Sequence, residues 1–259
     1  MTDAYIPAAT ILLLRDEPDF EVLMVERHAD IAFAGGAMVF PGGRMEKSDQ
    51  DPAWAALCDG YCEAPEDERA PRIAAIREAF EETGILLARR DGEMLGKDGV
   101  QFEGLRKTVE VQDEEFFKLI KREGLTLALD QLRLFARWRP PKEATHKRFD
   151  TWFFAAKAPD RQSARADGGE ATDIVWTTPA GVIADKEAGR RKMIFPTARN
   201  VELLGVSRCA SEALAYAETR QIRPIMPARE ERDGVQYVTI PKDLGYPVTE
   251  ELLETAFRI

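Results

Sequence analysis

Hydrophobic and polar positions alternate in short blocks over the first 45 residues, a pattern typical of strands joined by tight turns. Residues 8–14 and 20–27 form strand-sized apolar segments, and the turn-forming residues 16–19 separate them. Residues 33–43 contain four glycines and end in Phe40-Pro41-Gly42-Gly43. Because glycine permits tight turns and close approach of the backbone to a ligand, we expect a loop with one of these roles here.

A helix is predicted in the middle of the chain. Pro71 suits the first turn of a helix and Gly84 suits its left-handed C-terminal cap, so the helix is expected to begin near Pro71 and stop at Gly84. Residues 50–70 are acidic and irregular, and we interpret them as an insertion. Residues 103–123 indicate a further helical region.

The second half of the chain mixes strands and helices. Strands are expected at 132–138, 149–156 and 174–176, and helices at 179–188 and between 196 and 220. Segments 222–226 and 235–240 are predicted to pair as a hairpin across residues 232–234. This order of elements indicates an α/β (α+β) fold without a dividing linker. We expect one domain over residues 1–259, with a core at about 5–190, the insertion at 50–70 and a C-terminal extension at 191–259.

The charge balance narrows the classes of partner. Asp and Glu total 46 against 36 Lys and Arg, a formal net charge of −10 that on average repels a nucleic-acid backbone. No apolar run approaches the ~20 residues needed to cross a bilayer, and the first residues do not resemble a secretory leader. Three cysteines and two histidines make a disulfide framework or a zinc site improbable. We expect a cytoplasmic protein that binds neither nucleic acid nor membrane.

Residues 77–85, Arg-Glu-Ala-Phe-Glu-Glu-Thr-Gly-Ile, carry the strongest chemical signal. On a helix with about 100° per residue, Glu78, Glu81 and Glu82 lie on one face, opposite an apolar stripe. Like charges at this spacing repel by about 0.2–0.5 kcal/mol per pair. The pattern fits a solvated acidic face, and it also fits a site for a hard divalent cation such as Mg²⁺.

Together with Gly43 and Asp49, this segment resembles the Nudix box, Gly-x5-Glu-x7-Arg-Glu-U-x-Glu-Glu-x-Gly-U, in which U is a bulky aliphatic residue. The second half of the box matches at Arg77, Glu78, Glu81, Glu82, Gly84 and Ile85. Two departures stand out. Asp49 stands where the family usually has Glu, and the 27 residues 50–76 separate it from the arginine where the box has seven.

An interrupted box of this kind resembles that of the coenzyme A diphosphatase-like Nudix branch, Nudix motif 19. The resemblance covers roughly residues 8–205, and its further matches are Arg27, Gly36, the Phe40–Gly43 loop, residues 148–151, Glu170 and Pro179. The wider CoA-cleaving signature has a second arginine where this chain has Ala32. This departure leaves the specificity for coenzyme A (CoA) open.

The resemblance implies a Nudix-type α/β/α sandwich with a mixed sheet, extended by C-terminal helices. It also implies a hydrolase that uses Mg²⁺ or Mn²⁺ to cleave the diphosphate of a small nucleoside-diphosphate derivative. The implied metal ligands are the carboxylates of Glu78, Glu81 and Glu82 and the carbonyl of Gly42. Arg77 would orient the glutamates by ion pairing, and the implied substrate contacts are Arg27, Gly36, Phe40 and Gly43.

The resemblance does not fix the general base that takes the proton of the attacking water. It is a box glutamate, Glu78 or Glu82, or a glutamate on a later loop. Glu170, beside Gly168 and Gly169, is the stronger loop candidate, and Glu143 is the weaker one.

CoA or an acyl-CoA is the expected substrate. A pyrophosphatase for ADP-ribose or NADH stays open as an alternative, as does a non-catalytic nucleotide or metabolite sensor on the same fold. The intact glutamate set favours an enzyme, because a sensor could lose the metal ligands freely. The oligomeric state is also open, with a homodimer as one alternative.

Replacing Glu170 by Gln tests its role as the base. If Glu170 accepts the water proton, the variant should lower kcat by about 10²–10⁴ with little change in metal affinity. Steady-state kinetics and a metal titration measure the two effects. A loss of less than roughly threefold would return Glu170 to a solvated loop position and direct attention to Glu78 or Glu143.

Overall fold

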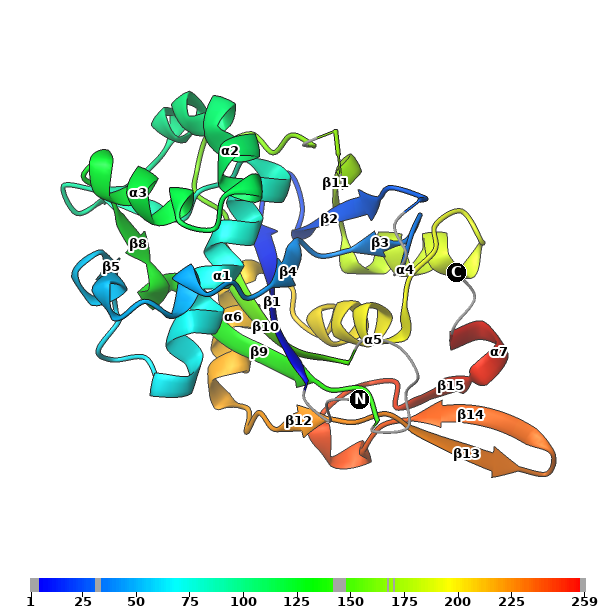
Figure 1. The fold of residues 1–259 in the computed structure, drawn as a ribbon. Coiled ribbons are helices and arrows are strands. Elements are labelled where there is room, and N and C mark those ends of the chain that lie inside the picture. Colours follow the sequence, from blue (N-terminus) through cyan, green and yellow to red (C-terminus); the bar gives the residue numbers. More distant parts are fainter. Residues whose placement is uncertain (1–4, 31–33, 142–147, 167, 170, 257–259) are drawn as a thin grey trace.

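The computed structural model describes residues 5–30, 34–141, 148–166, 168–169 and 171–256. A central sheet with the strand order β11-β2-β1-β10-β9-β12 forms its body (Figure 1). These strands are β1 (Ile6–Arg15), β2 (Glu21–Arg27), β9 (Arg133–Trp138), β10 (Phe149–Lys157), β11 (Ala171–Thr177) and β12 (Pro224–Ile225). The pairs β1–β10 and β9–β12 are parallel and the other pairs in this order are antiparallel, so the expected mixed sheet is confirmed.

Strands β1 and β2 pair only next to their connecting turn, through Leu14 with Val22 and Arg15 with Glu21. Farther along, the glycine-rich segment lies between them. There β3 (Met38–Val39) pairs with β2, and β4 (Gly42–Arg44) pairs with β1. The expected glycine-rich loop is therefore bonded into a fork of the sheet, which fixes its position in the core.

The side chains of β1 alternate between two layers of the core. Ile11 and Leu13 pack with α1 (Glu66–Thr83), while Leu12 and Leu14 pack with the helices on the other face. Those helices are α4 (Pro179–Glu187), α5 (Phe195–Leu204) and α6 (Ala210–Thr219). Figure 1 shows α1 and α5 on opposite sides of β1 and β10. The arrangement is the expected α/β/α sandwich.

Helix α1 begins earlier than the sequence indicated. It starts at Glu66, so the expected start near Pro71 is wrong and Pro71 lies inside the helix. Proline removes one intrahelical hydrogen bond, but the acidic first turn, residues 66–68, interacts favourably with the helix dipole. The helix end is confirmed, because Gly84 adopts the left-handed conformation with φ 77° and its N–H bonds to the carbonyl of Phe80 at 2.9 Å.

The insertion expected at 50–70 is more regular than predicted. Its last residues, 66–70, belong to α1, and the earlier part forms the 3₁₀ helix η2 (Pro52–Ala56) and β5 (Cys58–Asp59). A small sheet has the order β5-β8-β6-β7 and includes β6 (Ala88–Arg90), β7 (Glu93–Met94) and β8 (Thr126–Ala128). Trp54 anchors the insertion, since its ring is fully buried and lies 4.9 Å from that of Phe117.

The expected helical region at 103–123 is divided into shorter pieces. They are the end of the 3₁₀ helix η3 (Lys97–Leu105), then α2 (Arg106–Val111) and α3 (Glu115–Arg122). The described residues also form the 3₁₀ turns η1 (Ser48–Gln50), η4 (Leu129–Gln131) and η5 (Lys242–Leu244).

The C-terminal hairpin has a different first strand from the predicted one. Segment 222–226 contributes β12 to the central sheet, while β13 (Ala228–Arg232) pairs with β14 (Val235–Thr239). Asp233 and Gly234 both have positive φ, which makes a two-residue turn and sets Arg232 opposite Val235. Strand β15 (Glu250–Leu252) pairs with β14 and leads into α7 (Leu253–Ala256), so the extension contains strands besides its helices.

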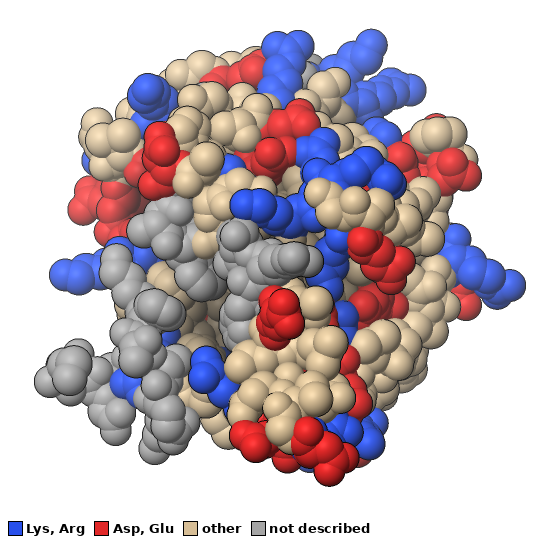
Figure 2. All heavy atoms as spheres, turned by 90° about the vertical axis from the view of Figure 1, so that its right-hand side faces the viewer, with Lys and Arg blue, Asp and Glu red and all other residues tan. Residues whose placement is uncertain are grey.

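Every helix within the described ranges is too short or too polar to traverse a bilayer. Basic and acidic side chains lie side by side over much of the face in Figure 2. The hairpin strand β13 is exposed along its whole length, and among the described strands it pairs with β14 alone.

Candidate active site

The last turns of α1 are buried on both sides. Ile73, Ile76 and Phe80 lie in the core, as the predicted apolar stripe requires. The opposite face is covered too, since Glu78 is only 8% exposed and Glu82 only 6%. A solvated acidic face is therefore wrong for these two residues, and their burial requires compensation from nearby groups.

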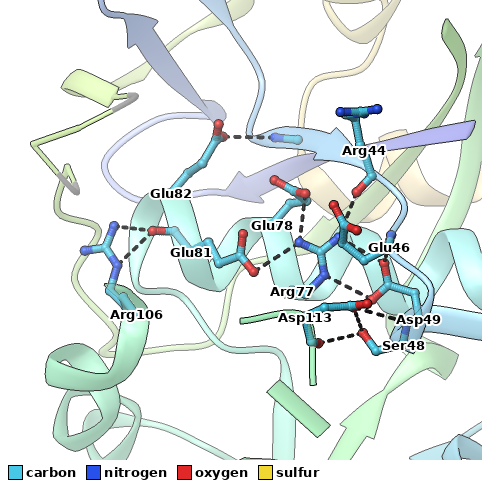
Figure 3. A network of polar contacts seen from close by, with 11 residues as sticks. Arg44, Glu46, Ser48, Asp49, Arg77, Glu78, Glu81, Glu82, Arg106 and Asp113 are labelled. Atoms are coloured by element: carbon cyan, nitrogen blue, oxygen red, sulfur yellow. Dashed lines mark hydrogen bonds and ion pairs between the residues drawn. The ribbon is translucent and has the colours of Figure 1, made fainter. Parts of the chain in front are cut away.

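Arg77 provides much of that compensation, and every N–H of its guanidinium has an acceptor. Nε and Nη2 donate to the two carboxylate oxygens of Asp49 at 3.0 and 2.9 Å, and Nη2 also donates to the carbonyl of Arg44 at 2.8 Å. Nη1 donates to Glu78 at 2.9 Å and to Glu81 at 3.0 Å (Figure 3). Arg77 thus orients two box glutamates, as the resemblance implied.

The sequence did not identify Asp49 as the main partner of Arg77. Its carboxylate is fully buried and also accepts the N–H of Glu46 at 2.8 Å. The two parts of the interrupted box therefore meet in space, although the intervening segment forms η2, β5 and most of α1. The box position of Asp49 was the available signal for this contact.

The glycine strand β4 lies directly against the carboxylates. The N–H of Gly42 donates to Glu82 Oε2 at 3.0 Å. A Cβ on Gly43 would lie 2.6 Å from Glu78 Oε2, and one on Gly42 would lie 2.5 Å from the hydroxyl of Thr10. Gly42 needs glycine because a Cβ there would also lie 2.6 Å from the backbone carbonyl of Ala9 and push β4 away from β1, while a Cβ on Gly43 would displace the Glu78 carboxylate.

The electrostatics of the cluster favour a cation. Burial and the charges of Glu81 and Glu82 raise the pKa of Glu78 well above its usual value, against the lowering effect of Arg77. Burial also raises the pKa of Glu81, and the charges of Asp49 and Glu110 add to this increase. The guanidinium of Arg77 thus pairs with three carboxyl groups, and a divalent cation would stabilise the ionised forms of the cluster.

Carboxylate oxygens are the ligands that Mg²⁺ prefers, so the donor set fits such an ion. Glu78 and Glu81 bind Arg77, and Glu82 binds the Gly42 amide. Within the described ranges, no group of three His, Cys, Asp or Glu side chains is gathered in a metal-binding arrangement. To bind an ion together, these carboxylates would have to move from their positions in this structure.

A pocket of about 500 Å³ contains these groups and most of the expected substrate contacts. Arg27, Phe40 and Gly43 line it, although Phe40 is only 2% exposed and packs edge-on against Phe153. Gly36 is not among the lining residues, and its N–H instead donates to the carbonyl of Arg27 at 3.0 Å. Glu170 and Glu143 lie outside the described residues.

One wall of the pocket was not foreseen from the sequence. It is the segment from α2 to the following loop, and its lining residues are Val109, Glu110, Val111 and Asp113. Arg106 fixes the start of α2 by donating to the carbonyl of Glu81 at 3.0 and 2.8 Å, and Ser48 donates to Asp113 at its other end (Figure 3). No local sequence pattern distinguishes these residues from an ordinary polar helix.

An α/β/α sandwich with an arginine-ordered glutamate helix against a glycine strand defines a Nudix hydrolase. A comparison with known protein families supports this class, because the sequence model of the NUDT19 Nudix domain matches residues 60–198. The chain belongs to this family of Nudix hydrolases. A divalent metal requirement and a substrate that is a nucleoside-diphosphate derivative come with this membership.

Individual relatives support this family assignment. Acyl-coenzyme A diphosphatase NUDT19 of Xenopus laevis is 26% identical over 283 residues, covering 90% of this chain and 73% of that protein. Putative nudix hydrolase 7 of Caenorhabditis elegans is 26% identical, covering 100% of this chain and 80% of that protein. The crystal structure of a NUDIX hydrolase from Alicyclobacillus acidocaldarius superposes with a TM-score of 0.69 at 26% identity, covering 82% of this chain and 96% of that one.

Replacing Asp49 by Asn should destabilise the metal-free protein by about 3–5 kcal/mol, because it removes the fully buried one of the three carboxylates that pair with the guanidinium of Arg77. Urea denaturation measures the change. Asp19→Asn, on the exposed turn before β2, is the matched control and should stay within about 0.5 kcal/mol of the parent protein. Equal stability of the two variants would contradict the role given to Asp49.

Proposed function

We propose that this chain hydrolyses the diphosphate of CoA or an acyl-CoA with the aid of Mg²⁺ or Mn²⁺. The observation that carries the proposal is the pocket in which Glu78, Glu81 and Glu82 lie against the glycine strand with Arg77 behind them. The similarity to acyl-CoA diphosphatases supports the choice of substrate.

In this proposal Glu78, Glu81 and Glu82 hold the cation together with the carbonyl of Gly42. When bound, the cation neutralises the diphosphate oxygens and acidifies the attacking water. Arg77 restricts Glu78 and Glu81 to the pocket side of α1, which lowers the entropy lost when they bind the ion. Gly43 leaves room for Glu78 to approach the substrate.

We assign substrate binding to the basic residues that line the same pocket. Arg27 and Arg44 both line it, and a guanidinium can bind two phosphate oxygens at once. Gly36 acts indirectly by bonding to the backbone of Arg27, and Phe40 forms part of the apolar wall.

Water attacks one phosphorus of the diphosphate, and the bond from that phosphorus to the bridging oxygen breaks. From CoA this gives two phosphomonoesters, 3′,5′-ADP and 4′-phosphopantetheine. We assign the water proton to Glu170, with Glu78 or Glu82 as the alternative acceptors.

We further propose that residues 1–259 work as one domain, with the extension 191–259 as part of it. Side chains of α5, α6 and β14 lie in the same core layer as Leu12 and Leu14 of β1. Removal of the extension would expose that layer of the sheet.

A substrate panel with CoA, acyl-CoAs, ADP-ribose, NADH and diadenosine polyphosphates tests the activity. CoA or an acyl-CoA should give the highest kcat/KM, and EDTA should abolish turnover because the diphosphate then lacks its cation. A preference of roughly tenfold or more for ADP-ribose would favour the alternative pyrophosphatase. Turnover of none of these would favour the sensor.

Glu82→Gln separates a metal ligand from a structural residue. The glutamine keeps the shape and can still accept the Gly42 N–H, while a buried charge and its repulsion of Glu78 disappear. In EDTA the variant should melt at the parent temperature or slightly above. Excess Mg²⁺ should raise its midpoint less than that of the parent protein, and turnover should fall by orders of magnitude. A metal-free loss above about 1 kcal/mol would instead make Glu82 a structural residue.

A further inference from the structure

The pocket extends past β4 to the other face of the sheet. Ala8 and Thr10 line it from β1, and they alternate with Ile11 and Leu13, which face α1. These two residues therefore face the layer of α5. On this side the pocket is further lined by Phe40, Phe149, Phe153, Thr151, Ile194 and Thr197.

The two parts of the pocket differ in charge. On the side of α1 the lining includes the carboxylates of Glu46, Glu78, Glu81, Glu82, Glu110 and Asp113. On the side of α5 the described lining carries no carboxylate, and it includes the cation Arg44, which pairs with Ala8 across β4 and β1 and so shares its face. A second anionic group of a substrate, beyond the diphosphate at the cation, would be repelled from the first part and not from the second.

The first turn of α5 faces this part of the pocket, which has no carboxylate in its described lining. Of the whole helix, only the N-cap residue Ile194 and Thr197 line the pocket. The first amides of an α-helix have no intrahelical acceptors, and an isoleucine side chain cannot cap them. No side-chain cap is present at this helix, and Pro196 contributes no N–H, so the first-turn amide that reaches the pocket is that of Thr197.

Thr197 gives a second and independent indication of a ligand. Its side chain is polar, the residue is only 3% exposed, and it lines the pocket. Among the described residues, none forms a hydrogen bond with its hydroxyl. The hydroxyl oxygen is not among the fully buried side-chain atoms that lack a partner, so it is open to the pocket and available to a ligand there.

Helix N-termini bind phosphate because their amides and the helix dipole both favour negative charge. We propose that the first turn of α5 and the hydroxyl of Thr197 bind a phosphomonoester of the substrate, separate from the diphosphate that is cleaved. This inference rests on the proposed function, in which that group is the 3′-phosphate of CoA. The site gives this chain a way to select CoA over dephospho-CoA that does not need an arginine at position 32.

Kinetics with CoA and dephospho-CoA test the site. The parent protein should prefer CoA in kcat/KM by about tenfold or more, the value of one hydrogen bond to a charged group. Thr197→Val keeps the side-chain shape and should reduce this ratio severalfold. Thr219→Val is the matched control, since Thr219 is exposed at the end of α6 and bonds only to the carbonyl of Tyr216. An equal rate with both substrates in the parent protein would overturn the site.

Ile194→Asp gives a sharper test because its two effects have opposite signs. The aspartate caps the free amides and should raise the melting temperature, while its charge should abolish the preference for CoA. Ile194→Asn caps without the charge and should lower the preference less. An unchanged ratio in Ile194→Asp would contradict the proposal.

Binding to the metal-free protein separates this inference from the proposed function. Calorimetry should show that 3′,5′-ADP binds the parent protein more tightly than 5′-AMP does, and that Ile194→Asp removes the difference. If neither CoA nor dephospho-CoA is hydrolysed but this difference is found, the proposed function fails and the phosphate site stands. If CoA is hydrolysed and the two nucleotides bind equally, only the phosphate site fails.

Discussion

The ion pair between Arg77 and Asp49 is the contact on which the rest of the site depends. Both side chains are almost fully buried, and a buried charge is tolerated only when it is paired and hydrogen-bonded. The same guanidinium reaches two box glutamates and the backbone of β4. Arg77 thus fixes the position of α1 relative to β4 and relative to Asp49, which belongs to the first part of the box. The long insertion is compatible with an intact site because its two ends meet at this pair.

The fork between β1 and β2 explains why a pocket exists at that point. In a continuous sheet those two strands would pair along their whole length, and side chains would fill the space between sheet and helix. Here the short strands β3 and β4 occupy the gap, and the glycines of β4 leave the carboxylates of α1 close to the backbone. The glycines of β4 therefore leave space for the carboxylates of α1 where the helix layer meets the sheet.

Local patterns predicted much of the fold and the chemically distinctive part of the site. The cap at Gly84, the strands on either side of residues 16–19 and the clustered glutamates all depend on nearest neighbours along the chain. What escaped prediction depends on distant partners. Examples are the pairing of Asp49 with Arg77, the parallel pairing of β12 with β9, and the anchoring of α2 by Arg106 at the carbonyl of Glu81. Helix α1 also continues through Pro71, because packing and an acidic first turn outweigh the local cost of proline.

The charge sequence of the exposed strand β13 opposes its pairing with the same strand of a second copy of the chain. An open strand edge is a template for another strand, and exposed edges are a common route to aggregation. The sequence Arg229-Glu230-Glu231-Arg232 reads the same in both directions. If two copies met edge to edge about the centre of this stretch, Arg229 would face Arg232 and Glu230 would face Glu231. Each opposed pair would repel. The palindrome thus opposes the symmetric self-pairing that an identical strand would otherwise favour.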